Sequence, residues 1–393
     1  MKIAVISRSN HNLKWGGDLR ALELIHQGIV ELGMEATLLP SVYDITDEDH
    51  ILLSNTVHDL RSDYKILSLM QKNYSVVGFH EDFIQYFSAA TGFYHFVALC
   101  VKGADDLGMP LSIDMLKENP DIIYYYGAAP KKCGLVNYSV MKDARVCIAN
   151  SPTEKATMLR DCPQGHAQSV FWPPGLVTSF AKDSTDEFLS LTGLKSKEYI
   201  LQIGRLEFRK NQLASILATK DLDIPLVFIA TKGNLTWYEE MCVEAILAYR
   251  KAPTIIIAQE IAPLKKGPLT IIPMPGGKKL PISTVQSALF HARVNLHPAF
   301  QELPGFTYLE SLFLGVPTIA SSWTTIADYL EGSDMNGLIQ YTEPHGLKRI
   351  EQLVVDALNK KIQLPGSLPA IFSRTPQKTA EEIINYITSS TGG

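Results

Sequence analysis

The sequence lacks several patterns that mark whole classes of protein. It has no stretch of about 18 apolar residues, so we expect no membrane span, and its first apolar run, "KIAVIS", is too short for a signal peptide. The five cysteines are scattered and include no CxxC pair, so we expect no disulfide framework and favour a reducing compartment, the cytoplasm. The motifs GxGxxG and GxxxxGK(S/T) are absent, so neither a dinucleotide-dependent oxidoreductase nor a P-loop enzyme is supported.

The charge balance excludes a second group of functions. The chain carries 36 Lys and Arg against 41 Asp and Glu, a net charge of −5, which is not typical of a nucleic-acid-binding protein. Residues 1–175 hold 15 of the basic and 20 of the acidic side chains, so this part lacks the bulk positive charge that binds an anionic membrane. We therefore expect membrane contact to be peripheral at most. No His, Cys and Asp cluster has metal-ligand spacing, and the Asp-x-Asp matches at 47–49 and 221–223 are interpreted as surface turns.

Strand and helix patterns alternate in the first part of the chain. "KIAVIS" is typical of a buried strand, and apolar residues from Leu19 to Ile29 then recur at helical spacing. Asp18 is a candidate N-cap for this helix and Gly33 a candidate C-cap. Further strands are predicted at 35–40, 50–55, 74–80 and 144–151. Alternation of this kind implies a parallel sheet with helices on both faces.

The pattern breaks at Pro173, Pro174 and Gly175 and restarts after a polar stretch. Six more apolar strands are predicted at 199–205, 225–230, 253–258, 269–273, 293–298 and 317–321. We therefore predict an α/β protein with two Rossmann-like domains whose parallel sheets face a central cleft. The first domain is residues 1–175, with an irregular excursion at about 84–140 that we interpret as helical, and the second is residues 176–370. Residues 371–393 are predicted to form a C-terminal helix that returns toward the first domain.

Distinctive residues follow the strands of the first domain. An open α/β sheet binds ligands beyond the carboxyl ends of its strands. His80 ends the strand at 74–80, and the pair Gly16 and Gly17 precedes the first helix. Each has a simpler interpretation, a structural histidine in one case and a tight turn in the other. At strand ends that face a cleft, however, a histidine is a candidate for catalysis, and glycines let backbone amides approach an anion.

Two basic residues follow the strand at 199–205. Arg205 ends that strand, and Lys210 is predicted to open a helix. A planar guanidinium and a compact ammonium group both suit phosphate oxygens, so this pattern favours a diphosphate clamp. A solvated turn with a lysine at a helix start is the alternative.

Two carboxylates stand eight positions apart in "AFQELPGFTYLESLFLGVPTIASS". Glu302 and Glu310 flank a turn at Pro304 and Gly305, at the start of a predicted helix. In isolation they are interpreted as a capping residue and a charge on a helix face. Their occurrence after Arg205 and Lys210 favours a functional pair.

With these residues in order, the sequence resembles the retaining nucleotide-sugar glycosyltransferases of family 4, which have the two-domain GT-B fold. "ELPGFTYLES" is similar to their E-x7-E motif, "QIGRLEFRKNQ" to their G-R-x4-K segment, and "GVPTIAS" to the strand after the second glutamate. "IANSPTEK" and "WPPG" resemble segments at the end of their first domain. The resemblance spans roughly residues 145–330, is thinner over the first 80 residues and is absent from about 84–140.

The resemblance implies a role for each candidate. Glu302 would lie against the donor sugar, and Glu310 would bind the ribose hydroxyls, since a carboxylate can accept two hydroxyl hydrogen bonds. Arg205 and Lys210 would neutralise the diphosphate, and His80 would act beside the sugar. The donor-binding set would be completed by Gly16, Gly17, Gly305, Phe306 and Thr307.

The resulting hypothesis is a retaining, metal-independent glycosyltransferase. It would use a nucleoside-diphosphate sugar as co-substrate, without a further cofactor, and an acceptor (sugar, lipid-linked or protein) that the sequence does not identify. Phe300, Gln301 and Leu303 depart from the family pattern around the first glutamate, which leaves the donor sugar open. A sugar-nucleotide epimerase on the same scaffold and a non-catalytic sugar-nucleotide-binding protein are the alternatives.

Overall fold

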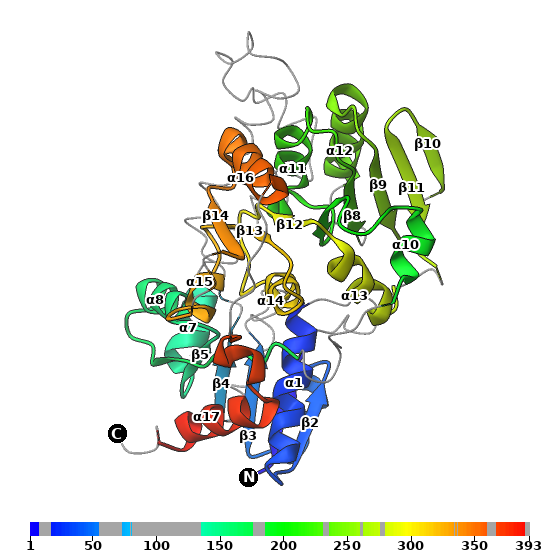
Figure 1. Ribbon diagram of the computed structural model, residues 1–393. Coiled ribbons are helices and arrows are strands. Elements are labelled where there is room, and N and C mark those ends of the chain that lie inside the picture. The colour runs from blue at the N-terminus through cyan, green and yellow to red at the C-terminus, as the bar shows by residue number, and fades with distance from the viewer. Residues whose placement is uncertain are drawn as a thin grey trace.

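The computed structural model contains two α/β domains, each built around its own sheet (Figure 1). It describes residues 1–7, 17–54, 73–78, 80, 135–175, 185–230, 236–259, 262–275, 280–333, 335, 337–359 and 367–389. The predicted two-domain α/β class is confirmed. Gly16 and the predicted excursion as far as residue 134 lie outside the described residues. None of the helices in the described part of the chain has the length and apolar composition that crossing a bilayer requires.

The first domain has a six-stranded parallel sheet in the order β2-β1-β3-β4-β5-β6. Strands β1, β3 and β5 are buried along their whole length, as expected for parallel strands covered on both faces. Its elements are β1 (Ile3–Ile6), α1 (Gly17–Glu31), β2 (Ala36–Leu39), the 3₁₀ turn η1 (Val42–Asp44), β3 (His50–Ser54), β4 (Asn73–Val77), α7 (Leu135–Asp143), β5 (Cys147–Ala149), α8 (Pro152–Asp161) and β6 (Ala167–Ser169).

The second domain has an eight-stranded sheet in the order β10-β11-β9-β8-β7-β12-β13-β14, parallel except for β10. Its elements are α10 (Glu187–Thr192), β7 (Ile200–Ile203), η3 (Phe208–Lys210), α11 (Gln212–Ala218), β8 (Leu226–Ala230), α12 (Thr236–Tyr249), β9 (Thr254–Ala258), β10 (Leu264–Lys266), β11 (Leu269–Pro273), α13 (Ile282–His291), β12 (Val294–His297), α14 (Phe306–Phe313), β13 (Thr318–Ser321), α15 (Ile326–Tyr329), β14 (Ile339–Thr342), α16 (Leu347–Asn359) and η4 (Ala370–Ser373).

The strand order of the second sheet reverses between β7 and β12. From β7 the chain adds β8 and β9 on one side, and β12, β13 and β14 are added on the other. The crevice outside the carboxyl ends of the strands at such a switch point is where open α/β sheets bind ligands. We therefore expect the loops that follow β7 and β12 to form a ligand-binding site.

Three strands were not predicted from the sequence. Strand β6 is Ala-Gln-Ser and partly exposed, β10 is exposed along its whole length, and β14 has two of its four residues outside the core. None of them has the continuous apolar run on which the other assignments rest. All three lie at or next to a sheet edge, where one side of a strand has fewer neighbours.

The C-terminal helix α17 (Pro376–Ser389) packs on α1 of the first domain (Figure 1). The contact is close at Gly28, where an added Cβ would lie 2.1 Å from the carbonyl oxygen of Pro376. A glycine inside a helix is otherwise unfavourable, and here it allows the two backbones to approach. Helix α1 already includes Gly17, so Asp18 lies within its first turn. The prediction that Asp18 is the N-cap is therefore wrong.

Hydrogen bonds also join the domains directly. The carboxylate of Asp328 accepts from the backbone N–H and the hydroxyl of Thr153, at 2.8 and 2.9 Å. The Trp172 N–H, just before the predicted break, donates to the Tyr329 hydroxyl at 3.2 Å. Residues from α8 and from the connection between the domains are thereby held against α15.

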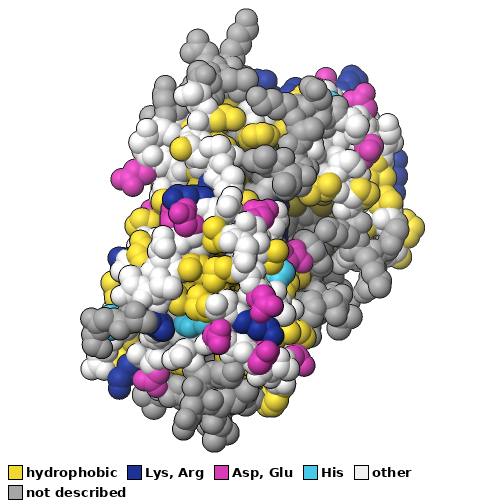
Figure 2. Space-filling view, turned by 90° about the horizontal axis from the view of Figure 1, so that it is seen from below, with side chains coloured by type: hydrophobic (Ala, Val, Ile, Leu, Met, Phe, Trp, Pro, Cys, Tyr) yellow, Lys and Arg dark blue, Asp and Glu magenta, His cyan; other side chains and the backbone are white. Residues whose placement is uncertain are grey.

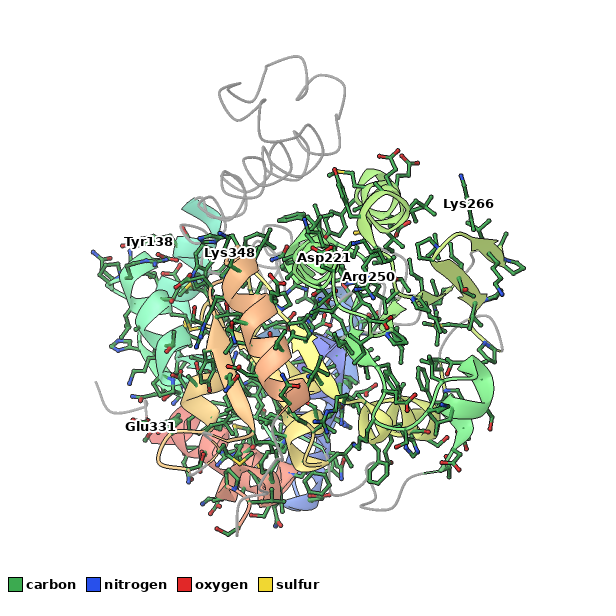
Figure 3. The ribbon with its side chains drawn as sticks, turned by 45° about the horizontal axis from the view of Figure 1, so that its top comes forward. Tyr138, Asp221, Arg250, Lys266, Glu331 and Lys348 are labelled. Atoms are coloured by element: carbon green, nitrogen blue, oxygen red, sulfur yellow. The ribbon has the colours of Figure 1, made fainter. Side chains whose placement is uncertain are left out.

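Charged side chains of both signs lie next to one another on the surface. Blue Lys and Arg side chains stand beside magenta Asp and Glu side chains on the face shown in Figure 2. Among the predicted surface turns, Asp47 is paired with Lys2, and Asp221 (Figure 3) lies 3.3 Å from the ammonium of Lys251.

Candidate functional site

The loop after β7 is anchored by side chains. It forms the 3₁₀ turn η3, and Asn211 then adopts the left-handed conformation (φ 58°) before α11 begins. The Asn211 amide donates to the carbonyls of Pro298 (2.9 Å) and Pro344 (2.5 Å), which fixes this loop to the segments after β12 and β14. The prediction that Lys210 opens a helix is therefore wrong, because Lys210 ends the 3₁₀ turn. Asparagine is one of the few residues that adopts such a conformation readily.

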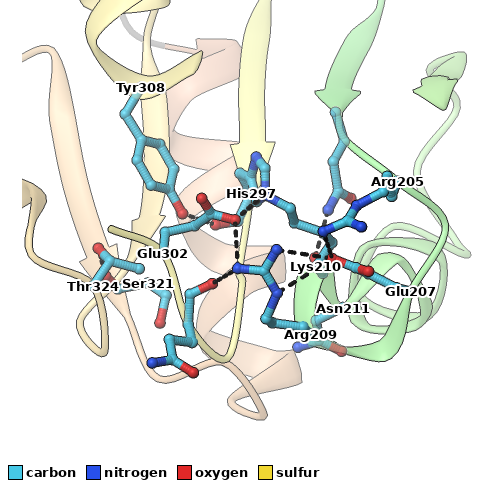
Figure 4. A network of polar contacts seen from close by, with 12 residues as sticks. Arg205, Glu207, Arg209, Lys210, Asn211, His297, Glu302, Tyr308, Ser321 and Thr324 are labelled. Atoms are coloured by element: carbon cyan, nitrogen blue, oxygen red, sulfur yellow. Dashed lines mark hydrogen bonds and ion pairs between the residues drawn. The ribbon is translucent and has the colours of Figure 1, made fainter. Parts of the chain in front are cut away.

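Glu207 forms ion pairs with two arginines of this loop, Arg205 and Arg209 (Figure 4). Its buried carboxylate lies 2.9 Å from Nη2 of Arg209 and 3.4 Å from Nη2 of Arg205. Burial alone would raise the pKa of Glu207, but the charges of Arg205, Arg209 and Lys210 outweigh it and lower the pKa to about 2. Glu207 is therefore ionised at neutral pH and positions both guanidinium groups.

Lys210 and Glu302 form a buried ion pair between the loops after β7 and β12 (Figure 4). Nη1 of Arg209 lies 3.9 Å from the same carboxylate oxygen of Glu302. Burial and then the Arg209 charge lower the pKa of Lys210, whereas contact with the Glu302 carboxylate favours the charged ammonium. Together with Arg205 and Glu207, this gives three cations against two carboxylates. The cluster therefore has an excess of positive charge at the switch point of the sheet.

His297, the last residue of β12, lies beside Glu302 in this network (Figure 4). Its Nε2 lies 4.0 Å from the Glu302 carboxylate, and neither ring nitrogen has a hydrogen-bond partner in the described part of the chain. Burial, followed by the charges of Lys210 and Arg209, holds the pKa of His297 well below its usual value. The imidazole is therefore neutral and adds no charge to the cluster.

The turn before α14 requires a glycine. Gly305 has φ 85°, and an added Cβ there would lie 2.7 Å from the ring of Tyr308. The ring of Phe306, the first residue of α14, lies against Gly17, where an added Cβ would be 3.2 Å away. The start of α14 thus meets the start of α1 across the domain boundary, and Thr307 follows Phe306 in the first turn of α14.

Glu310, one turn further along α14, also meets the first domain. Its carboxylate is 5% exposed and accepts from Nη1 of Arg20 in α1 at 2.5 Å. The Arg20 guanidinium also lies over the ring of Phe306, 5.3 Å from its centroid. The predicted ribose ligand is thus already joined to a cation from the other domain.

His80 is held by two carboxylates of α8. Its backbone N–H donates to Glu154 at 2.6 Å, and its Nε2 lies 2.8 Å from the carboxylate of Asp161. Burial would raise the pKa of Asp161, but its bonds with His80 and Arg160 outweigh burial and lower it. An ionised Asp161 fixes the orientation of the imidazole.

A pocket of about 120 Å³ lies between the two domains next to His80. One wall is formed by the first domain and the other by the loops after β12 and β13. Its lining residues are His80, Thr153, Glu154, Thr157, Gln301, Leu303, Ser322, Trp323, Thr324 and Thr325. Gln301 Oε1 and Thr325 Oγ1 are buried without a hydrogen-bond partner among the described residues. Polar side chains of both domains, such as Thr157 and Thr324, therefore line this pocket.

The structure brings most of the predicted residues into two neighbouring groups. Arg205, Lys210 and Glu302 form one cluster, and His80 shares the pocket with the residues on either side of Glu302. Gly17, Phe306 and Glu310 form the second group at the domain boundary, beside Gly305 and Thr307. Their predicted roles stay predictions.

Sequence reasoning missed three residues that complete these groups: Arg209, Arg20 and Asp161. A cation in the first turn of a helix and an anion at its last residue both oppose the helix dipole. Arg20 and Asp161 break this rule in α1 and α8, which is the signal that could have indicated them. Arg209 was visible as a second basic residue beside Lys210.

The sequence matches no protein-family model and no curated protein. Solved structures, in contrast, match it over nearly its whole length. A sucrose-phosphate synthase from Thermosynechococcus elongatus has a TM-score of 0.61 at 13% identity, over 99% of this chain and 94% of that one. Anabaena HepE, solved with UDP and glucose, has a TM-score of 0.56 at 12% identity, over 99% and 98% of the two chains. WaaG, a glycosyltransferase of lipopolysaccharide biosynthesis, has a TM-score of 0.53 at 13% identity over the full length of both.

The chain has the GT-B fold. The fold predicted from the resemblance is therefore confirmed. In this GT-B chain the cation cluster lies in the second domain, at the switch point of its sheet, and the pocket with His80 lies between that domain and the first. At 13% identity or less the likeness is one of fold, so activity has to be argued from the site.

Proposed function

We propose that this GT-B chain transfers a sugar from a nucleoside-diphosphate sugar to an acceptor with retention of anomeric configuration. The observation that carries the proposal is the excess positive charge at the β7 and β12 switch point, where Arg205, Arg209 and Lys210 meet two carboxylates. Hydrogen bonds from guanidinium and ammonium groups to phosphate oxygens are among the strongest that proteins make. A diphosphate is a ligand that this cluster suits.

The cations would act on the leaving group. As the bond between sugar and diphosphate breaks, negative charge grows on the diphosphate oxygens, and positive groups already in place stabilise it. Because Glu207 and Glu302 hold Arg209 and Lys210 in position beforehand, little reorganisation is needed when the reaction occurs. The departing nucleoside diphosphate would stay bound to this cluster until release.

Glu302 and His80 would face the sugar from opposite domains. The ion pair with Lys210 makes the Glu302 carboxylate a poor nucleophile, which supports a front-face reaction rather than a covalent intermediate. His80, oriented by Asp161, would orient the donor or stabilise the departing charge. One buried water needs roughly 10–15 Å³. The adjoining pocket of about 120 Å³ therefore has room for about ten waters, a space comparable to that of one sugar ring.

A thermal-shift panel of nucleotides and nucleotide sugars tests the proposal. A ligand that binds only the folded state, at 100 times its Kd, raises the free energy of unfolding by about 2.7 kcal/mol. We expect one nucleoside diphosphate and its sugar derivatives to raise the melting temperature, and HepE, solved with UDP and glucose, makes UDP-sugars the first to test. If no nucleotide in the panel shifts the transition, the proposed donor class is wrong.

Turnover of the bound donor separates the proposal from its two alternatives. A glycosyltransferase releases nucleoside diphosphate, with water as a slow acceptor when no other is supplied. An epimerase would instead convert the sugar of the intact donor, and a non-catalytic binder would leave the donor unchanged. Chromatography of the nucleotide products distinguishes the three results.

Activity is expected to survive removal of divalent metal. The diphosphate charge would be met by Arg205, Arg209 and Lys210 rather than by a carboxylate-bound cation. Nucleoside diphosphate release in excess EDTA should therefore match release in buffer with Mg²⁺. Loss of activity with EDTA, restored by Mn²⁺, would show that the leaving group is neutralised differently.

Glu302→Gln should separate turnover from nucleotide affinity. The substitution removes a charged contact with the sugar, worth about 1.5 to 3 kcal/mol, so turnover should fall roughly 10- to 150-fold. It also releases Lys210 from its ion pair, so affinity for the nucleoside diphosphate alone should be unchanged or tighter. Turnover with saturating donor and calorimetric titration of the diphosphate give the two quantities.

The control for this variant is Glu382→Gln. Glu382 of the C-terminal helix pairs with Arg374 at 2.6 Å, so this change removes an ion-paired carboxylate away from the cluster. It should alter neither quantity. Equal losses of affinity for the diphosphate and for its sugar derivative in Glu302→Gln would contradict a role at the sugar.

A further inference from the structure

Arg20 joins three parts of the molecule that meet at the domain boundary. Its Nη1 donates to the Glu310 carboxylate at 2.5 Å, its Nη2 donates to the Pro174 carbonyl at 3.1 Å, and its guanidinium covers Phe306. Pro174 belongs to the connection between the domains, whereas Glu310 and Phe306 belong to α14 of the second. One side chain of α1 thus reaches both the connection between the domains and the helix that carries Glu310.

The pairing leaves part of the Glu310 carboxylate available. Arg20 contacts Oε1, and no other side-chain partner of Glu310 is present in the described part of the chain. Oε2 is not among the buried polar atoms that lack a partner, so it remains accessible. An ionised carboxylate has about four acceptor positions on two oxygens, which is enough for one guanidinium and the hydroxyls of a diol.

Arg20 and Glu310 each occupy a position that is unfavourable for a charged side chain on its own. A cation in the first turn of α1 opposes the helix dipole, and a carboxylate that is 95% buried requires a counter-charge. The two unfavourable positions compensate each other only when the domains are together. The Arg20–Glu310 contact therefore depends on both domains.

We propose that Arg20 is a positioning residue for nucleotide binding: from the first domain, it orients the Glu310 carboxylate so that Glu310 accepts from the ribose hydroxyls. This rests on the proposed function, in which a nucleoside diphosphate occupies the second domain. It adds that the ribose acceptor is shared between the domains. Arg20 strengthens nucleotide binding through Glu310 and does not compete with the ribose for the Glu310 carboxylate.

The test is a cycle of one substitution in the protein and one deletion in the ligand. The parent and Arg20→Met are titrated with the nucleoside diphosphate that binds the parent, and with its 2′-deoxy form. We expect the parent to bind the deoxy form about tenfold more weakly, as the loss of a hydrogen bond to a charged group implies. Arg20→Met should bind the ribose form about tenfold more weakly than the parent does, and should distinguish the two forms by less than about twofold.

Two further variants isolate the role of the charge. Arg20→Lys keeps a cation beside Glu310 and should recover part of the discrimination between ribose and deoxyribose. Arg374→Met removes another arginine that joins distant segments, since Arg374 donates to the Phe171 carbonyl at 2.7 Å and pairs with Glu382. It should leave the discrimination at its parental value. Melting temperatures of all variants show whether each is folded.

The outcomes separate this proposal from the proposed function. Tighter binding by Arg20→Met would show that Arg20 competes with the ribose, and an equal loss for both nucleotide forms would show that it acts elsewhere. Parental discrimination in Arg20→Met, together with its loss in Glu310→Gln, would also overturn the proposal while the function stands. If the parent binds no nucleoside diphosphate, the proposed function fails first.

Discussion

Lys210→Met should lower the affinity for nucleoside diphosphate about 100-fold with the fold intact. The ammonium lies between the loops after β7 and β12, and the Lys210 side chain is only 14% exposed, so its contacts are poorly screened by water. A hydrogen bond to a charged group is worth about 1.5 to 3 kcal/mol, and the upper part of that range is expected at such a site. The substitution also leaves the Glu302 carboxylate without its closest cation, and this anion would then repel the diphosphate. Calorimetric titration of the diphosphate measures the effect.

Lys197→Met is the matched control for this prediction. Lys197 is a more exposed lysine of the second domain, and its ammonium donates to the carbonyls of Phe290 and Ala292 at the end of α13. Its removal should change stability but not nucleotide affinity. Arg205→Ala should weaken binding less than Lys210→Met, because Arg205 is 35% exposed. Parental affinity in both Lys210→Met and Arg205→Ala would show that the clamp is misassigned.

His80→Ala should reduce turnover about 100-fold or more and leave nucleoside diphosphate affinity nearly unchanged. The loss of one donor that stabilises transition-state charge typically costs about 2.7 to 4 kcal/mol. His80 belongs to the first domain and the cation cluster to the second, so the ground-state contacts of the diphosphate do not depend on it. Asp161→Asn should reproduce part of the loss, since it removes the carboxylate that orients the imidazole.

His50→Ala serves as the control for a buried histidine in the same sheet. His50 begins β3, at the amino end of the strands, and its Nε2 lies 3.0 Å from the hydroxyl of Ser75. Its loss should lower the melting temperature without a specific effect on turnover. If His80→Ala retains near-parental turnover while folded, His80 is a structural residue and the chemistry of the first domain is unassigned.

The fold was predictable where side-chain patterning is strong. Fully buried parallel strands such as β8, Leu-Val-Phe-Ile-Ala, are continuous apolar runs bounded by turn residues, so their type and order could be read directly. Edge strands carry a weaker pattern, because fewer of their side chains are buried. Strand β10, Leu-Lys-Lys, is stabilised by its pairing with β11 rather than by its own composition, and no local pattern indicates it.

The site was predictable as a set of residue types but not as a set of contacts. The order of Arg205, Lys210 and Glu302 indicated an anion site, yet the ion pair between Lys210 and Glu302 depends on the packing of two loops 92 positions apart. Asn211 decides the shape of the first loop through carbonyls that come from much later in the chain. Such long-range anchors have no signature in a single sequence.

Contacts across the domain boundary were still less accessible. Arg20 and Glu310, which lie in different domains, are 290 positions apart. Within the first domain, His80 and Asp161 are also distant in sequence, 81 positions apart. The sequence does contain charges that oppose the helix dipole, a cation at the start of one helix and an anion at the end of another. Conflicts of this kind are expected at functional sites, where long-range interactions override local preference.

The release of nucleoside diphosphate from a panel of nucleotide sugars, in excess EDTA, tests whether the chain is a metal-independent glycosyltransferase. We expect at least one nucleotide sugar to be turned over, with water or an added acceptor, and its release of diphosphate to fall at least tenfold in Lys210→Met and His80→Ala. Folded protein that turns over no nucleotide sugar, or whose turnover is unaffected by both substitutions, would contradict this expectation.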